Sequence, residues 1–180
     1  MDDYLAYHRD YLPKRRAQLE SLFSFLNFNS GSSVVSVGCG VAAEFSVLDF
    51  SRKVGMDLNP VLIMFCKEVH DAEFFCGNYM THFSNIPDGS VDLVLALDID
   101  TNILLVPFIR DSLRKLAKNG RIVVTERENN VNVYGRMLLL PFVQQIKSEF
   151  SLAHVKFYSR MNQVTDKDDR DNFVLVVTKV

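Results

Sequence analysis

The chain has 180 residues, of which 48% are hydrophobic and 23% are charged, and its formal net charge is −2. These values are typical of one ordinary soluble globular domain. They lack the excess of Lys and Arg expected of a protein built to hold long nucleic acid. We therefore predict a single domain spanning 1–180 and no long nucleic acid partner.

The cysteines and the termini give no sign of a metal, an export signal or a membrane. Cys39, Cys66 and Cys76 show neither CxxC spacing nor paired histidines, so neither a disulfide framework nor a zinc site is predicted. The first ten residues are acidic and aromatic, and no apolar run reaches the roughly 20 residues of a membrane span. We predict a cytoplasmic protein without a membrane span or a bound metal.

The N-terminal segment 2–28 is predicted to form one or two helices. Its apolar residues recur at i, i+3, i+4 and i+7, which gives one face able to pack on a sheet; they are Leu19, Leu22, Phe23 and Leu26. The turn-forming residues Asn29–Ser33 then predict a linker into the sheet.

The stretch from Ser33 to Pro60 is the centre of the prediction. An apolar strand ends in the glycines Gly38 and Gly40, the segment 41–50 is predicted as a crossover helix, and a second strand ends in Asp57. Glycine lets the backbone turn tightly and lets a ligand approach the main chain. A carboxylate at the tip of the neighbouring parallel strand can accept hydrogen bonds from the hydroxyls of a ribose. The pattern therefore predicts a nucleoside-cofactor site.

Two classes of cofactor fit this turn. Gly38, Gly40 and Ala43 satisfy the dinucleotide fingerprint G-x-G-x-x-G/A, but one such match is weak because glycine turns are common. The turn alone leaves open a nicotinamide oxidoreductase that uses NAD or NADP.

Further elements continue the alternation of strands and helices. Asn59-Pro60 predicts the start of a helix over 61–69, and two strands are predicted over 73–76 and 91–97, with the turn 87–90 before the second. A helix over 109–118 that stops at Asn119-Gly120 precedes a strand at 121–125. Residues 134–150 predict either a crossover helix kinked at Pro141 or a lid over an apolar substrate, and 152–158 with 173–177 predict a hairpin.

Four segments in register with the glycine turn resemble one family. They are Gly55–Pro60, Phe75–Asn78, Ile86–Val94 and Leu113–Val124. Together with the turn, over about residues 33–126, they resemble the class I S-adenosylmethionine-dependent methyltransferases, most closely the branch that acts on small molecules and quinones. The resemblance implies a doubly wound α/β fold with a mostly parallel seven-stranded sheet, helices on both faces and a C-terminal antiparallel hairpin. Its parts would be a helical cap at 1–30, a cofactor-binding core at 33–126 and a C-terminal helix and hairpin at 134–180.

The resemblance also implies a function and a site. The implied cofactor is S-adenosyl-L-methionine, and the implied acceptor is a small molecule. The cofactor-binding residues it implies are Gly38, Cys39, Gly40, Asp57, Leu58, Asn78, Tyr79 and Asp98. Asn78 replaces the Asp that the family uses to accept from the adenine amino group, and Ala42 replaces the third glycine of the turn. Because of Ala42, a non-catalytic binding or scaffold domain is the main alternative to an enzyme.

No catalytic residue is assigned from the sequence. Asp100, His8 and Glu126 are the candidates to take a proton from a hydroxyl acceptor. The Asn/Asp-Pro-Pro-aromatic signature of methyltransferases that act on nucleobase amino groups is missing from the segment Asp98–Asn102. This argues against DNA adenine or cytosine as the substrate.

Overall fold

The computed structural model describes residues 2–28, 30–98, 105–127, 144–145, 147–148, 153–159 and 172–180. The chain divides into two compact units, Met1–Asn85 and Ile86–Val180. The predicted division into parts 1–30, 33–126 and 134–180 stays a prediction. The predicted helix or lid at 134–150 lies outside the described residues except for 144–145 and 147–148.

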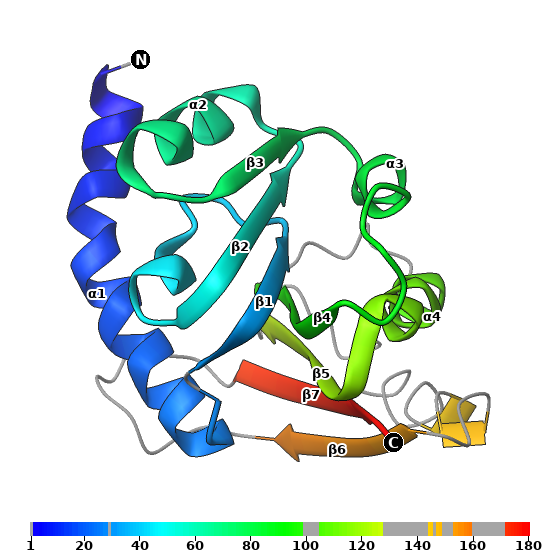
Figure 1. Ribbon diagram of the computed structural model, residues 1–180. Coiled ribbons are helices and arrows are strands. Elements are labelled where there is room, and N and C mark those ends of the chain that lie inside the picture. Colours follow the sequence, from blue (N-terminus) through cyan, green and yellow to red (C-terminus); the bar gives the residue numbers. More distant parts are fainter. Residues whose placement is uncertain are drawn as a thin grey trace. The chain divides into compact units, whose positions relative to one another are not determined.

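The first unit begins with one long helix, α1, which spans Asp2–Leu26 and includes Pro13. Leu19, Leu22, Phe23 and Leu26 are all buried. This confirms the apolar face that their helical spacing predicts. The helix, blue in Figure 1, contacts the segment that follows the first strand.

Three parallel strands form the sheet of this unit: β1 Ser30–Val37, β2 Asp49–Asp57 and β3 Glu73–Cys76. Their arrows point the same way in Figure 1, with Val35 opposite Val54 and Met56 opposite Phe75. The linker predicted at Asn29–Ser33 is wrong for 30–33, because Ser30 and Gly31 already pair with Asp49 and Phe50. Backbone pairing outweighs the turn-forming composition there.

The crossover between β1 and β2 differs most from expectation. The helix predicted over 41–50 is replaced by a single 3-10 turn, η1, at Ala43–Ser46. The end of the predicted segment belongs to β2, where the buried Phe50 ring stacks on Phe28 with centroids 6.1 Å apart. This packing and the pairing with β1 hold 49–50 extended, which leaves too few residues for a helix.

The two helices that follow β2 and β3 are α2 Pro60–Val69 and α3 Tyr79–Phe83. The start of α2 is as predicted, because the Asn59 side chain accepts a hydrogen bond from Val61 N at 2.9 Å. Leu62, Phe65 and Cys66 are buried, whereas Val69 is 49% exposed at the end of the helix.

The second unit contains β4 Val91–Ala96, helix α4 Leu105–Lys115, β5 Leu116–Arg127, β6 Ala153–Ser159 and β7 Asn172–Lys179. Strand β4 pairs in parallel with β5, and β7 pairs antiparallel with both β5 and β6. The strand order is β3-β2-β1-β4-β5-β7-β6. The predicted fold class, a mostly parallel seven-stranded sheet with an antiparallel pair at the C-terminus, is confirmed.

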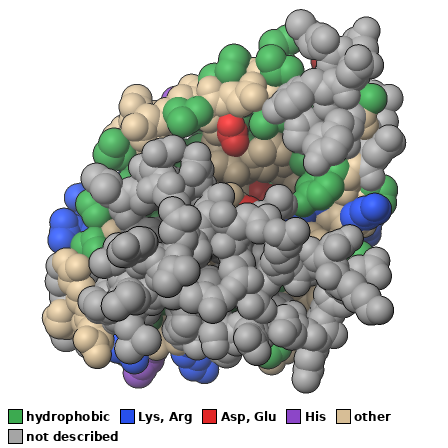
Figure 2. Space-filling model, turned by 180° about the vertical axis from the view of Figure 1, so that it is seen from behind, with side chains coloured by type: hydrophobic (Ala, Val, Ile, Leu, Met, Phe, Trp, Pro, Cys, Tyr) green, Lys and Arg blue, Asp and Glu red, His purple; other side chains and the backbone are tan. Residues whose placement is uncertain are grey.

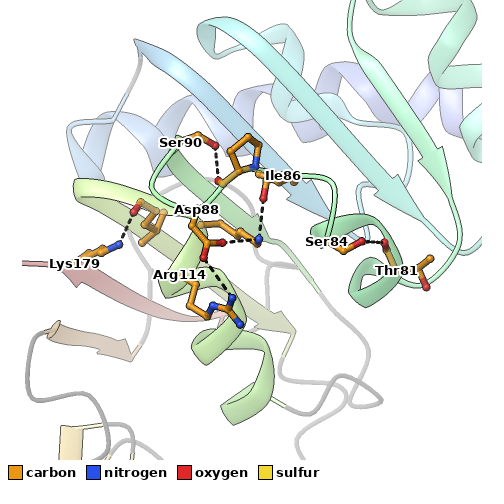
Figure 3. A network of polar contacts seen from close by, with 10 residues as sticks. Thr81, Ser84, Ile86, Asp88, Ser90, Arg114 and Lys179 are labelled. Carbon is orange, nitrogen blue, oxygen red and sulfur yellow. Dashed lines mark hydrogen bonds and ion pairs between the residues drawn. The ribbon is translucent and has the colours of Figure 1, made fainter.

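Helix α4 ends three residues before the stop predicted at Lys118. The carbonyls of Arg114 and Lys115 accept the amides of Gly89 and Ser90 at 3.0 and 2.9 Å. The turn before β4 thus supplies donors for the last carbonyls of α4, and the helix ends at Lys115. Lys115 Nζ also donates to Asp88 at 2.7 Å, and this bond, with weaker support from Arg114, lowers the pKa of Asp88 (Figure 3).

Candidate functional site

The glycine turn after β1 has an open main chain. Gly38 and Gly40 have φ angles of 67° and 55°, a region that favours glycine. The Gly38 and Cys39 amides donate to Met56 O at 2.8 and 3.0 Å, which ties the turn to β2. Among the described residues, none has an atom within 4 Å of a Cβ placed on Gly40. The surface of the turn is therefore open at Gly40, and a ligand can reach the backbone there.

The carboxylate of Asp57 faces this turn. Its Oδ2 accepts a hydrogen bond from Gly40 N at 2.8 Å, and its Oδ1 accepts one from Asn59 N at 2.8 Å. Each carboxylate oxygen has about two acceptor positions, so one on each oxygen is left for a ligand. The carboxylate is partly exposed at the end of β2. This geometry suits a pair of adjacent hydroxyls.

The tip of β3 lies beside the tip of β2, because Gly77 N donates to Asp57 O at 2.9 Å. Asn78 is exposed, and its side-chain oxygen accepts from Met80 N at 3.0 Å, so it caps α3. Tyr79 packs edge to face on Phe83, with ring centroids 5.2 Å apart. Leu58, which follows Asp57, is 74% exposed. The first unit thus brings together seven of the eight implied site residues at one end of its strands.

The eighth residue, Asp98, belongs to the second unit and follows β4. Its φ angle is 51°, an uncommon conformation for a residue with a side chain. Its amide donates to Thr125 Oγ1 at 2.9 Å, and Thr125 Oγ1 lies 3.2 Å from Asp98 Oδ1. Thr125 is buried in β5. One hydroxyl therefore holds both the backbone and the carboxylate of Asp98.

A family model described as "Methyltransferase domain" matches residues 35–124, which is half of the chain. The matched range begins in β1 and ends in β5, so it includes the glycine turn, Asp57 and Asp98. The chain belongs to the S-adenosylmethionine-dependent class I methyltransferase family. A search of curated proteins finds no match.

Solved structures confirm the methyltransferase fold. A putative methyltransferase of Haloferax volcanii, solved in complex with the Trm112 methyltransferase activator, has a TM-score of 0.66 at 17% identity, covering 99% of this chain and 96% of that one. A SAM-dependent methyltransferase from Archaeoglobus fulgidus has a TM-score of 0.65 at 13% identity, covering 96% and 99%. The plantazolicin methyltransferase BpumL, in complex with SAH, has a TM-score of 0.68 at 13% identity, covering 96% and 87%.

The short crossover of this methyltransferase disfavours a dinucleotide. Pyrophosphate in dinucleotide folds binds at the N-terminus of a full crossover helix, where amides and the helix dipole attract negative charge. Here η1 has only four residues. The family match and this local structure both argue against the nicotinamide alternative.

Two polar residues next to the site were missed from the sequence. Glu44 in η1 is buried and accepts a hydrogen bond from the buried Ser36 of β1. Thr125 is the other. The sequence carried one signal for Thr125, a polar residue ending the apolar run Ile122–Val124 at a strand tip. Glu44 carried none, because it falls in the segment predicted to be a helix.

We expect Thr125→Val to lower the free energy of unfolding of the methyltransferase by about 1–3 kcal/mol, because the buried site loses the hydroxyl that holds Asp98. Thr125→Ser, which retains the hydroxyl, should stay closer to wild type. Urea denaturation of the three proteins measures the difference. Equal losses in the Val and Ser variants would contradict the role of the hydroxyl.

Cys39 is a buried residue of the glycine turn. Its side chain is buried, and a hydrogen bond with Cys66 together with burial raises the pKa of the Cys39 thiol well above its ordinary value. A thiol that stays protonated is a poor nucleophile. Cys39 therefore acts as a small packing residue.

His70, which ends α2, gives the first unit a pH-dependent stability. Burial lowers the pKa of His70, and the positive charge of Lys53 adds to this effect, while a hydrogen bond to Val41 opposes it. The unfolded chain then binds the proton more readily than the folded one as pH falls through about 6.5. We expect wild type to lose stability from about pH 7 to about pH 5, and His70→Gln to lose less, in thermal denaturation. Parallel curves for the two proteins would contradict this assignment.

The three candidate proton acceptors lie outside the side chains that the structure describes. Asp100 lies outside the described residues, and so do the side chains of His8 and Glu126. Within the described part of the chain, no group of three His, Cys, Asp or Glu side chains forms a metal site. Among the same residues, no helix is long and apolar enough to cross a membrane.

Proposed function

We propose that this methyltransferase binds S-adenosylmethionine across the tips of β1, β2 and β3 and transfers its methyl group to a small-molecule acceptor. The observation that carries the proposal is the hydrogen bond from Gly40 N to Asp57 Oδ2. It places a carboxylate with acceptor positions to spare beside a turn whose surface is open at Gly40.

Each implied site residue of the first unit is assigned to one part of the cofactor. Asp57 accepts from the two ribose hydroxyls, and the main chain of Gly38, Cys39 and Gly40 faces the methionine end. Leu58 and Tyr79 offer apolar surface to the adenine, and the exposed Asn78 offers a polar side chain to its edge. Asp98, which Thr125 holds within the second unit, stays a predicted cofactor-binding residue. Each of these roles is a proposal.

The cofactor supplies an electrophilic methyl group on a sulfonium, ready for in-line displacement. The tasks left to the protein are to bind, to orient and to exclude water. Asp57 would hold the ribose, and its hydrogen bond from Gly40 N holds the backbone of the glycine turn beside the ribose. Asp98 is pre-organised, because its carboxylate and amide are both held by Thr125 before any ligand binds.

Ala42 does not argue for a non-catalytic scaffold. Its side chain is fully buried, at 0% exposure, and its backbone takes the left-handed conformation with φ of 52° that glycine would adopt. The methyl group therefore points into the protein and not onto the surface of the turn.

The net charge of the chain favours a small-molecule acceptor over a nucleic acid. The net charge of −2 gives no general attraction for polyanions. On the face shown in Figure 2, the described Lys and Arg side chains, in blue, are scattered and do not gather into a patch. A reducing cytoplasm stays the predicted compartment.

Calorimetric titration tests the cofactor. We expect saturable binding of S-adenosylmethionine and of its demethylated product, and no comparable binding of NAD or NADP. Labelled cofactor incubated with separate small-molecule and RNA fractions of a cell extract then tests the acceptor, with label expected in the small molecules. Failure of both sulfur compounds to bind would refute the cofactor proposal, and label in RNA alone would refute the acceptor class.

A further inference from the structure

Two side chains, one in α2 and one directly after it, hold two consecutive carbonyls of the glycine turn. Cys66 Sγ donates to Gly40 O at 3.2 Å, and His70 Nε2 lies 2.9 Å from Val41 O. Because a carbonyl oxygen only accepts, Nε2 must carry the hydrogen. Cys66 lies in the last turn of α2 and His70 is the residue that caps its end, and their side chains reach neighbouring carbonyls of the same turn. Two adjacent peptide groups of the turn are thus held by side chains at the end of α2.

The imidazole of His70 is held in place by aromatic rings. Its centroid is 6.3 Å from that of Phe45 and 6.2 Å from that of Phe74. Its backbone amide also donates to Cys66 O at 3.0 Å, which closes the end of α2. Burial lowers the pKa of His70, so the ring is neutral near pH 7 and donates from Nε2. A fixed, neutral ring is suited to orient another group.

These bonds determine how the turn presents its amides. In a trans peptide the C=O and the following N–H point in opposite directions. With Gly40 O directed at Cys66, the Val41 N–H points away from α2. On the other side of the same residue, Gly40 N donates to Asp57 Oδ2. The peptides around Gly40 are therefore fixed from two sides, by Asp57 and by α2.

We propose that His70, together with Cys66, is a positioning residue for cofactor binding: the two side chains hold the carbonyls of Val41 and Gly40 and so fix the backbone of the glycine turn beside Asp57. This inference rests on the proposed function. A histidine at the end of a helix can complement the helix dipole. Here its side chain also bonds to Val41, 29 residues earlier in the chain.

The test compares His70→Leu with His70→Gln, whose side-chain amide can still donate to Val41 O. Glu68→Gln, at an exposed position of the same helix, is the surface control. Ile122→Val, which shortens a fully buried side chain of β5, is a control for lost stability that leaves the turn untouched. Two quantities are measured below the unfolding temperature of every variant: the affinity for S-adenosylhomocysteine by calorimetry, and the amide hydrogen exchange of Gly40 and Val41 without ligand.

We expect His70→Leu to bind S-adenosylhomocysteine about tenfold more weakly than wild type and to exchange the Gly40 amide faster. His70→Gln should recover most of the affinity, and both controls should match wild type. Wild-type affinity and exchange in His70→Leu would overturn the inference, as would an equal loss of affinity in Ile122→Val. If wild type does not bind the compound, the proposed function fails, and the exchange of Gly40 in His70→Leu still decides whether His70 holds the turn.

Discussion

Replacing Asp57 by Ala is expected to weaken the binding of S-adenosylmethionine more than any other single change in the proposed site. Hydrogen bonds to a charged group contribute about 1.5–3 kcal/mol each, so losing the carboxylate should raise the dissociation constant about 10- to 150-fold or more. Asp57 also accepts the amides of Gly40 and Asn59, and their loss should loosen the turn. Isothermal titration calorimetry of wild type and variant measures the effect.

Asp57→Asn is the matched variant. The Asn side chain has one acceptor oxygen where Asp has two, so it should keep one of the two backbone bonds and bind with intermediate affinity. Asp49→Ala, at the exposed opposite end of β2, is the control for removing a negative charge and should bind like wild type. An affinity of Asp57→Ala equal to that of the control would show that the sugar binds elsewhere.

The sequence predicted the parts of this site that depend on local chemistry. Glycine after a strand of valines predicts an open turn, and an acid after the next strand predicts a carboxylate beside it, because parallel strands align their carboxyl ends. The structure joins the two through Gly40 and Asp57. Asn59-Pro60 likewise predicts the start of α2, since an N-cap and a proline act within one turn of helix.

The parts that sequence reasoning missed depend on contacts between distant residues. The helix predicted over 41–50 fails because Phe50 stacks on Phe28 and belongs to β2. The end of α4 was placed too late because its last carbonyls bind the turn at Gly89 and Ser90, which precede the helix in the chain. His70 and Thr125 have roles only through partners 29 and 27 residues away. No local pattern identifies such partners.

Gly55→Ala is expected to give the largest loss of stability among single-methyl changes in the first unit. A Cβ at Gly55 would lie 2.5 Å from Phe74 Cδ1 and Cε1 and 3.1 Å from Cys39 Sγ. Overpacking of this kind costs about 1–3 kcal/mol, so the midpoint of urea denaturation should fall. Gly31→Ala, which adds the same methyl at an exposed position of β1, is the control and should be destabilised less than Gly55→Ala.

The same methyl group should also weaken cofactor binding, because Phe74 is part of the structure behind the turn. Its ring packs on both Phe45 and His70, so a displaced Phe74 shifts the imidazole that holds Val41 O.

A second substitution, Phe74→Leu, makes room for the methyl group of Gly55→Ala. The double variant should therefore be about 1 kcal/mol more stable than the sum of the two single losses predicts. Strictly additive losses would show that the clash is relieved elsewhere. In that case the methyl group would affect only the packing of β2 and would not move the side chains behind the glycine turn.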